Sequence, residues 1–231
     1  MADALIVFVK QPRPGAVKTR LARALGDDAA AQVYQVLAEG EVRSTAPVAR
    51  EYQRFLFFSP GTARAAMEGW FPGETLLPQQ GDDLGARMAA AFAEVFARGF
   101  ARAAIVGSDV PWVTRGHVLE ALAAVDRHDL ALGPAADGGY YLLALARPLP
   151  ALFEDVAWST DRVLAATLER AGRLGLRVRL LEQLPDVDTL DDVASAWERL
   201  EPLLLPHPEL HARLSAATGR CHARPEHPAA R

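Results

Sequence analysis

Apolar residues along the chain follow two alternating patterns. Short continuous apolar runs predict strands that are buried on both faces. Longer stretches in which apolar residues recur every three to four positions predict helices. The predicted strands are 4–9, 54–58, 75–79, 103–107, 129–135, 139–145 and 177–184, and the predicted helices are 27–42, 62–70, 84–100, 114–125, 160–173 and 189–203. This alternation predicts an α/β fold with a mostly parallel sheet and helices on both faces.

The end of the chain departs from this pattern. Residues 206–231 carry four prolines, four arginines and four histidines with little apolar periodicity. We therefore expect one domain over 1–203 and an appendage or flexible tail over 204–231. Histidines and Cys221 in this segment could in principle bind Zn²⁺, but their spacing fits no compact zinc pattern, which favours a solvated tail.

Composition excludes several classes of protein. Half of the 231 residues are apolar, which is enough to bury a core, and the net charge of −4 argues against general nucleic-acid binding. The single cysteine excludes an internal disulfide framework. No signal-peptide pattern is present, and no apolar run approaches the roughly 18 to 20 residues that span a bilayer. We expect a cytoplasmic protein without a membrane partner.

The first predicted strand leads into a strongly basic loop. The stretch FVKQPRPGAVKTRLA, residues 8–22, contains Lys10, Arg13, Lys18 and Arg20. Two interpretations are open: a solvated surface turn, or a seat for phosphate groups. The loop is no Walker A motif, because glycine and lysine are separated, and no G-x-G-x-x-G follows the strand. Its two prolines remove N–H donors, so phosphate binding here would depend on side-chain charge.

Aspartates follow three later strands. Asp109 comes after 103–107, Asp137 after 129–135, and Asp188 after 177–184. Each also has an ordinary structural explanation: a helix cap is about equally probable for Asp109, and a turn is favoured for Asp137-Gly138-Gly139. Ligands of open parallel sheets bind at the carboxyl ends of the strands. Carboxylates and cations together at this edge suit a phosphate-bearing ligand held with Mg²⁺ or Mn²⁺.

Six blocks in order carry a family resemblance. They are FVKQPRPGAVKTRLA, QGDDLGARM, GSDVP, GPAADGGYYLLAL, WSTDRVL and PDVDTLDDV. Over about residues 4–200 the chain resembles the bacterial glycosyltransferase-A-like family, including arsenosugar-biosynthesis (radical-SAM/selenodomain-associated) glycosyltransferases, of the nucleotide-diphospho-sugar transferase superfamily. The resemblance implies a GT-A-like three-layer α/β/α sandwich with a mostly parallel mixed sheet. It also implies that 1–203 is a nucleotide-binding transferase domain.

The resemblance implies roles for individual residues. Asp109 matches the aspartate that holds a divalent metal at the diphosphate, and Asp188 matches a second acidic position near the metal. Asp137 is implied to act as a catalytic base or to orient the sugar. The other positions implied to bind nucleotide, sugar or acceptor are Gly15, Lys18, Arg20, Asp83, Arg87, Gly138, Gly139, Trp158, Ser159 and Thr160.

Three functions are compatible with these residues. The first is a metal-dependent glycosyltransferase that uses a nucleoside-diphosphate sugar and a small-molecule acceptor. The second is a guanylyl- or cytidylyltransferase-like enzyme that uses a nucleoside triphosphate and a small phosphorylated acceptor, and the third is a non-catalytic nucleotide-binding protein. GSDVP supplies one carboxylate where relatives often have D-x-D, so a second must come from elsewhere. A homodimer is compatible with each of these functions.

Overall fold

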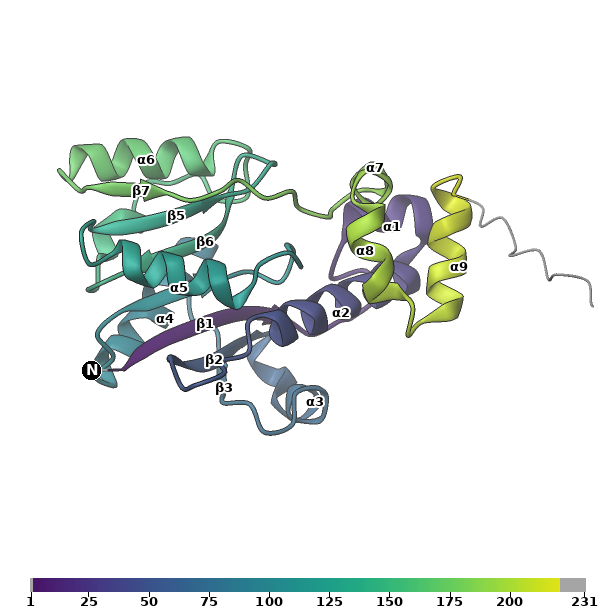
Figure 1. Cartoon of the computed structure of the whole chain (residues 1–231), viewed down its shortest axis with the longest axis horizontal. Coiled ribbons are helices and arrows are strands. Elements are labelled where there is room, and N and C mark those ends of the chain that lie inside the picture. Colours follow the sequence, from purple (N-terminus) through teal and green to yellow (C-terminus); the bar gives the residue numbers. More distant parts are fainter. Residues whose placement is uncertain (1, 221–231) are drawn as a thin grey trace, which may run out of the picture.

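A seven-stranded sheet forms the centre of the computed structural model, which describes residues 2–220 (Figure 1). The strand order is β3-β2-β1-β4-β6-β5-β7. Strand β6 is antiparallel to β4 and β5, and the other neighbours are parallel. The strands are β1 (Asp3–Lys10), β2 (Tyr52–Ser59), β3 (Leu76–Pro78), β4 (Ala103–Val106), β5 (Leu130–Pro134), β6 (Tyr140–Leu145) and β7 (Val178–Leu180). The predicted mostly parallel mixed sheet is confirmed.

Helices cover both faces of the sheet. Strand β1 is buried along its whole length except at Lys10, so its alternate side chains enter two different cores. Leu5, Val7 and Val9 pack with α3 (Arg64–Trp70) and α5 (Arg115–Ala124) on one face. Ala4, Ile6 and Phe8 pack with α4 (Leu84–Ala97) and α6 (Val163–Arg173) on the other. The continuous apolar run of β1 therefore reflects a central strand, and the three-layer α/β/α sandwich is confirmed.

A group of helices lies beyond the end of β1 (Figure 1). It contains α1 (Thr19–Leu25), α2 (Asp27–Ser44), α7 (Leu190–Ser195), α8 (Trp197–Leu204) and α9 (Pro208–Ala217). These helices share a core that includes Leu21, Leu37, Leu200 and Leu214, all fully buried. Because α1 and α2 follow β1 while α7 to α9 follow β7, this packing joins the segment after the first strand to the segment after the last strand.

Helix α9 lies in the segment that composition assigns to an appendage or tail. Leu210 and Leu214 on this helix are buried against the helical group, so residues 204–220 pack on the rest of the chain. Residues 221–231, with Cys221 and two of the histidines, lie outside the described residues. The domain boundary at residue 203 therefore stays a prediction.

Two helical boundaries differ from the sequence pattern. Helix α1 was not predicted, because it has seven residues and buries only Leu21 and Leu25. The predicted helix 189–203 is divided at Ala196 into α7 and α8. Short 3₁₀ helices occur at Gly61–Ala63 and Pro150–Phe153. Within residues 2–220, no helix is long and apolar enough to cross a bilayer.

Candidate functional site

A cavity of about 760 Å³ opens at the edge where the parallel strands end. It receives residues from the ends of β1, β4 and β5, from the start of β6, and from the segment after β7. The beginning of α4 and the loop before α6 complete its walls. The charged residues that line it are Lys10, Arg20, Asp82, Asp83, Arg87, Asp109, Asp137, Asp161, Asp186 and Asp188. The cavity is thus where ligands of open α/β sheets are expected to bind.

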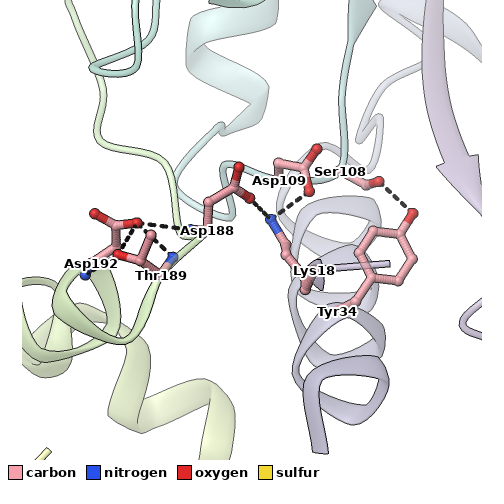
Figure 2. A network of polar contacts seen from close by, with 7 residues as sticks. All are labelled: Lys18, Tyr34, Ser108, Asp109, Asp188, Thr189 and Asp192. Carbon is pink, nitrogen blue, oxygen red and sulfur yellow. Dashed lines mark hydrogen bonds and ion pairs between the residues drawn. The ribbon is translucent and has the colours of Figure 1, made fainter. Parts of the chain in front are cut away.

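Lys18 joins two of these aspartates at the wall of the cavity (Figure 2). Its Nζ lies 2.5 Å from Asp109 Oδ1 and 2.7 Å from Asp188 Oδ1. The Lys18 side chain is only 2% exposed, whereas those of Asp109 and Asp188 are 53% and 33% exposed. The structure therefore places one buried cation between two carboxylates that open onto the cavity. All three residues were predicted to belong to the site.

The three charges act on one another's protonation. Burial by itself would lower the pKa of the Lys18 ammonium, but Asp109 and Asp188 outweigh this effect and the pKa lies above its ordinary value. Although Asp109 faces the cavity, its surroundings partly desolvate it, which by itself would raise its pKa. The Lys18 ammonium outweighs that cost, and the pKa of Asp109 lies below its usual range. Asp109 and Lys18 are therefore both charged at neutral pH.

Helix α2 supplies a hydroxyl beneath the site. Tyr34 Oη lies 2.7 Å from Ser108 Oγ and accepts a hydrogen bond of 2.7 Å from the Lys10 backbone N–H. Tyr34 and Ser108 are buried, and Figure 2 shows their contact beside Asp109. This pair fixes the end of β1 to the loop after β4, and therefore holds the basic loop and Asp109 in one arrangement.

A second polar residue of α2 lies in the same region without a partner. Glu41 is fully buried, and neither carboxyl oxygen forms a hydrogen bond with the described residues. The Val110 N–H favours the ionised carboxyl, but its geometry falls short of a hydrogen bond. Burial first, and the charge of Asp109 second, raise the pKa of Glu41 well above its ordinary value. A fully buried carboxyl without a partner is costly when ionised, so Glu41 is expected to retain its proton.

Sequence reasoning did not identify Tyr34 or Glu41 as part of the site. Tyr34 and Glu41 are seven residues apart on α2, a spacing that places both on the same side of a helix. That spacing was the available signal, but the surrounding alanines marked the segment as ordinary core. For the loop that contains Lys10, the sequence left a surface turn and a phosphate-binding site open, and the structure places Lys10 in the wall of the cavity.

Most of the predicted binding residues line the same cavity. They are Arg20, Asp83, Arg87, Gly139, Trp158, Ser159 and Thr160, together with Asp109, Asp137 and Asp188. Several of them also have local structural roles. Asp83 accepts a hydrogen bond from the Ala86 N–H and caps α4, and Asp137 Oδ1 accepts one from the Gly139 N–H across the turn. Their presence in the cavity wall places them in reach of a ligand.

Two predicted glycines are not in the cavity wall. Gly138 has a φ of 88°, and a Cβ there would lie 2.0 Å from the Asp161 carbonyl oxygen. Its role is to let two loops of the site meet. Gly15 also has a positive φ, of 75°, and its neighbour is the Asp27 side chain. Neither position directly contacts the cavity, so we assign both glycines to the backbone geometry of the site.

The loop before α6 fits against the start of α4 through one glycine. A Cβ on Gly85 would lie 2.3 Å from Trp158 Nε1, so only glycine leaves room for the indole ring. Trp158 in turn lies beside Phe153, with ring centroids 6.3 Å apart. This close packing fixes the orientation of Trp158 in the cavity wall, and it explains the second glycine of the block QGDDLGARM.

The residues at the Lys18 position suit a divalent cation. Carboxylate oxygens are preferred ligands of Mg²⁺ and Mn²⁺, and Asp109 and Asp188 already converge on one cation. Within residues 2–220, no cluster of three or more acidic, histidine or cysteine side chains could hold a metal. Mg²⁺ commonly uses one or two carboxylates together with phosphate and water oxygens, so the pair fits a metal that arrives with a phosphate ligand.

Comparison with protein families assigns this chain to one of them. The family described as "Uncharacterized protein conserved in bacteria (DUF2064)" matches residues 43–160, which is just over half of the chain. The chain belongs to the DUF2064 family. The matched part of this DUF2064 protein includes Asp109 and Asp137, whereas Lys18 and Asp188 lie outside it. No curated protein matches the chain.

Solved structures share the fold. A "putative nucleotide-diphospho-sugar transferase" from Desulfovibrio desulfuricans G20 has a TM-score of 0.84 and 31% identity, over 95% of this chain and 98% of that one. CMP:2-keto-3-deoxy-manno-octonic acid synthetase complexed with CTP gives 0.55 and 14%, over 89% and 99%. The manganese complex of Rv0371C from Mycobacterium tuberculosis H37Rv gives 0.51 and 19%, over 87% and 98%. The DUF2064 protein therefore has the nucleotide-diphospho-sugar transferase fold. The resemblance to arsenosugar glycosyltransferases stays a prediction.

Proposed function

We propose that this protein is a metal-dependent glycosyltransferase that moves a sugar from a nucleoside diphosphate to a small acceptor. The observation that carries the proposal is the pair Asp109 and Asp188, which share one cation position at the wall of a large cavity. Lys10, Arg20 and Arg87 give the same cavity positive charge for phosphate oxygens. The 31% identical relative with the transferase name supports the same class of reaction.

Asp109 and Asp188 would hold the divalent metal together with oxygens of the diphosphate. When bound, the metal supplies positive charge that stabilises the leaving diphosphate. Arg20 and Lys10 would bind the phosphate oxygens and stabilise the same negative charge as it develops. These residues act on the leaving group, and the reaction also needs a group that acts on the acceptor.

Asp137 is our candidate for that second role. Its Oδ1 is held by the Gly139 N–H at 2.8 Å, which fixes the carboxylate and leaves Oδ2 for a substrate hydroxyl. An acceptor hydroxyl would attack the anomeric carbon while the bond from this carbon to the diphosphate oxygen breaks. Asp137 would take the hydroxyl proton, and the nucleoside diphosphate would leave with the electron pair of the broken bond. Trp158, Ser159 and Thr160 lie in the wall where sugar or acceptor would be held.

Thermal unfolding with UDP-, GDP-, CDP- and TDP-sugars and with nucleoside triphosphates, each with and without Mn²⁺, tests the ligand class. We expect a metal-dependent stabilisation by one nucleoside-diphosphate sugar. Slow hydrolysis of that sugar nucleotide without acceptor would support glycosyl transfer. Uniform absence of stabilisation by every ligand would contradict the proposal and favour a non-catalytic protein.

Asp109→Asn tests the metal position. We expect this variant to bind Mn²⁺ more weakly, because a neutral amide replaces one of two charged ligands. Asp82→Asn is the matched control, since it removes the same charge from the same cavity at a residue that does not contact Lys18. If Asp109→Asn retained full metal-dependent binding of nucleoside diphosphates, the metal assignment would be wrong.

A nucleotidyltransferase is the second candidate. The specific observation in its favour is the number of cations near the aspartate pair: Lys10 and Arg20 line the cavity, and Lys18 contacts both aspartates. In that reaction a phosphorylated acceptor attacks the α-phosphate of a nucleoside triphosphate, and pyrophosphate leaves. The basic loop argues against it, because Pro12 and Pro14 offer no N–H donors to a triphosphate. Pyrophosphate release with any triphosphate and acceptor would favour this second function.

A further inference from the structure

The ammonium of Lys18 occupies the cation position of the site. Its two close contacts are to Asp109 Oδ1 and Asp188 Oδ1, the carboxylates that the proposed function assigns to the metal. A metal that draws both carboxylates to itself would remove the partners of an ammonium whose side chain is 2% exposed. A buried charge that loses its partners is strongly unfavourable. Metal binding at this position is therefore linked to a new partner for Lys18.

The residues around Lys18 provide no replacement partner. Among the described residues, its ammonium forms hydrogen bonds and ion pairs with Asp109 and Asp188 alone. The Lys18 charge influences the buried carboxyl of Glu41, but this carboxyl forms no hydrogen bond with the ammonium. The main chain of Lys18 is also fixed, because this residue caps α1 in a left-handed conformation and its carbonyl accepts the Ala22 N–H. A change of partner is therefore a movement of the side chain.

A diphosphate in the cavity would provide the missing partner. Asp109 and Asp188 both open onto the cavity, so an ammonium that leaves their Oδ1 atoms enters the space where phosphate oxygens would lie. We propose that Lys18 is an internal counter-ion that couples the two ligands: it offsets part of the negative charge of the aspartate pair while the site is empty, and it moves to the diphosphate when the metal takes its place. This inference rests on the proposed function, since it requires a metal at the aspartate pair and a diphosphate in the cavity.

Two binding properties follow from this exchange. The metal alone must displace Lys18 from its only partners, so it binds weakly. A nucleoside diphosphate alone meets an ammonium that is already paired, so it also binds weakly. Each ligand removes the cost of binding for the other, and thermodynamic linkage requires that the two effects be equal in size. Lys18 is thus a positioning residue that makes the site favour the complete metal–diphosphate pair over either component.

Mn²⁺ binding without nucleotide decides the proposal, with free Mn²⁺ measured by electron paramagnetic resonance. We expect Lys18→Met to bind Mn²⁺ about tenfold more tightly than the wild-type protein, a change within the usual range for coupling between sites. Lys10→Met is the matched control, because it removes another positive charge that acts on Asp109 without removing a contact to either aspartate. Its effect on Mn²⁺ affinity should be smaller. UDP or GDP should tighten Mn²⁺ binding more in the wild type than in Lys18→Met.

A Mn²⁺ affinity that does not increase in Lys18→Met would overturn the inference. Unchanged or weaker Mn²⁺ binding by Lys18→Met would mean that Lys18 does not compete with the metal, and weaker binding would mean that Lys18 prearranges the carboxylates for it. The variant Asp109→Asn separates this failure from failure of the proposed function: if it binds Mn²⁺ as the wild type does, the metal site itself is wrong. Should Lys18→Met be unstable, the rise of its unfolding temperature with Mn²⁺ concentration gives the same comparison, because bound metal stabilises the folded form.

Discussion

Glu41 offers a direct test of the electrostatics beneath the site. Its carboxyl has no exposed surface and no hydrogen-bond partner among residues 2–220. The charge of Asp109 opposes its ionisation, the Lys18 ammonium and the Val110 N–H favour it, and burial is the largest influence. Because the net effect raises the pKa of Glu41, we expect Glu41→Gln to increase the free energy of unfolding at neutral pH. The increase should grow as the pH rises.

The size of the effect follows from proton linkage. In the unfolded chain, the Glu41 carboxyl loses its proton near the ordinary glutamate pKa of about 4.3. The folded protein keeps this proton to a higher pH, so between the two pKa values it binds one proton more than the unfolded chain. Its stability then falls by about 1.4 kcal/mol for each pH unit of increase in this window. Glutamine does not titrate, so the free energy of unfolding of Glu41→Gln should rise relative to that of the wild type by the same amount for each pH unit.

Urea unfolding at a series of pH values from 5 to 8, with EDTA to exclude metal, measures this difference. Glu41→Leu is an internal control. This variant also lacks the titrating group, so its free energy of unfolding relative to the wild type should change with pH as that of Glu41→Gln does. The different shape of leucine adds only a difference that does not depend on pH. A Glu41→Gln difference that is the same at pH 5 and pH 7 would refute the reasoning, because it would show that the folded protein holds no extra proton at Glu41.

Two substitutions test the packing around the cavity. Gly85→Ala should lower the free energy of unfolding by about 1–3 kcal/mol, because the new methyl group displaces the Trp158 indole. Gly69 is the control: it is a helical glycine whose added Cβ would meet nothing within 4 Å, so Gly69→Ala should raise the free energy of unfolding by about 1 kcal/mol in the same urea experiment. Tyr34→Phe should cost about 1–3 kcal/mol, because it leaves the Lys10 N–H without its acceptor. Wild-type stability of Tyr34→Phe would mean that another acceptor replaces the hydroxyl.

The sequence determined the layers of the fold. The apolar run at 4–9 predicts a central strand, and β1 proves to be buried on both faces. Helical periodicity over 84–100 predicts α4, whose Met88, Phe92 and Val95 are buried in the core. These features could be predicted because burial patterns repeat locally along a strand or helix. Helix α9 was missed by the same reasoning, since it lies in a segment rich in proline and histidine and only Leu210 and Leu214 among its apolar side chains are buried in the core.

The sequence also indicated which edge of the sheet carries the site. Asp109, Asp137 and Asp188 each follow a strand, and the rule for open parallel sheets brings such residues together. All three line one cavity in the structure. Local pattern was sufficient here because chain direction alone fixes where a parallel strand ends.

Only the tertiary structure decided how the charges are paired. Lys18 and Asp188 are 170 residues apart, and their contact depends on how α1 and the segment after β7 pack together. In the sequence Glu41 is one residue of an alanine-rich helix, and only the fold shows that it is buried near Asp109 and Lys18. A local pattern reports which side of an element is buried, but the partner of a charge depends on long-range packing, and that partner determines whether the charge is a surface residue or part of a site.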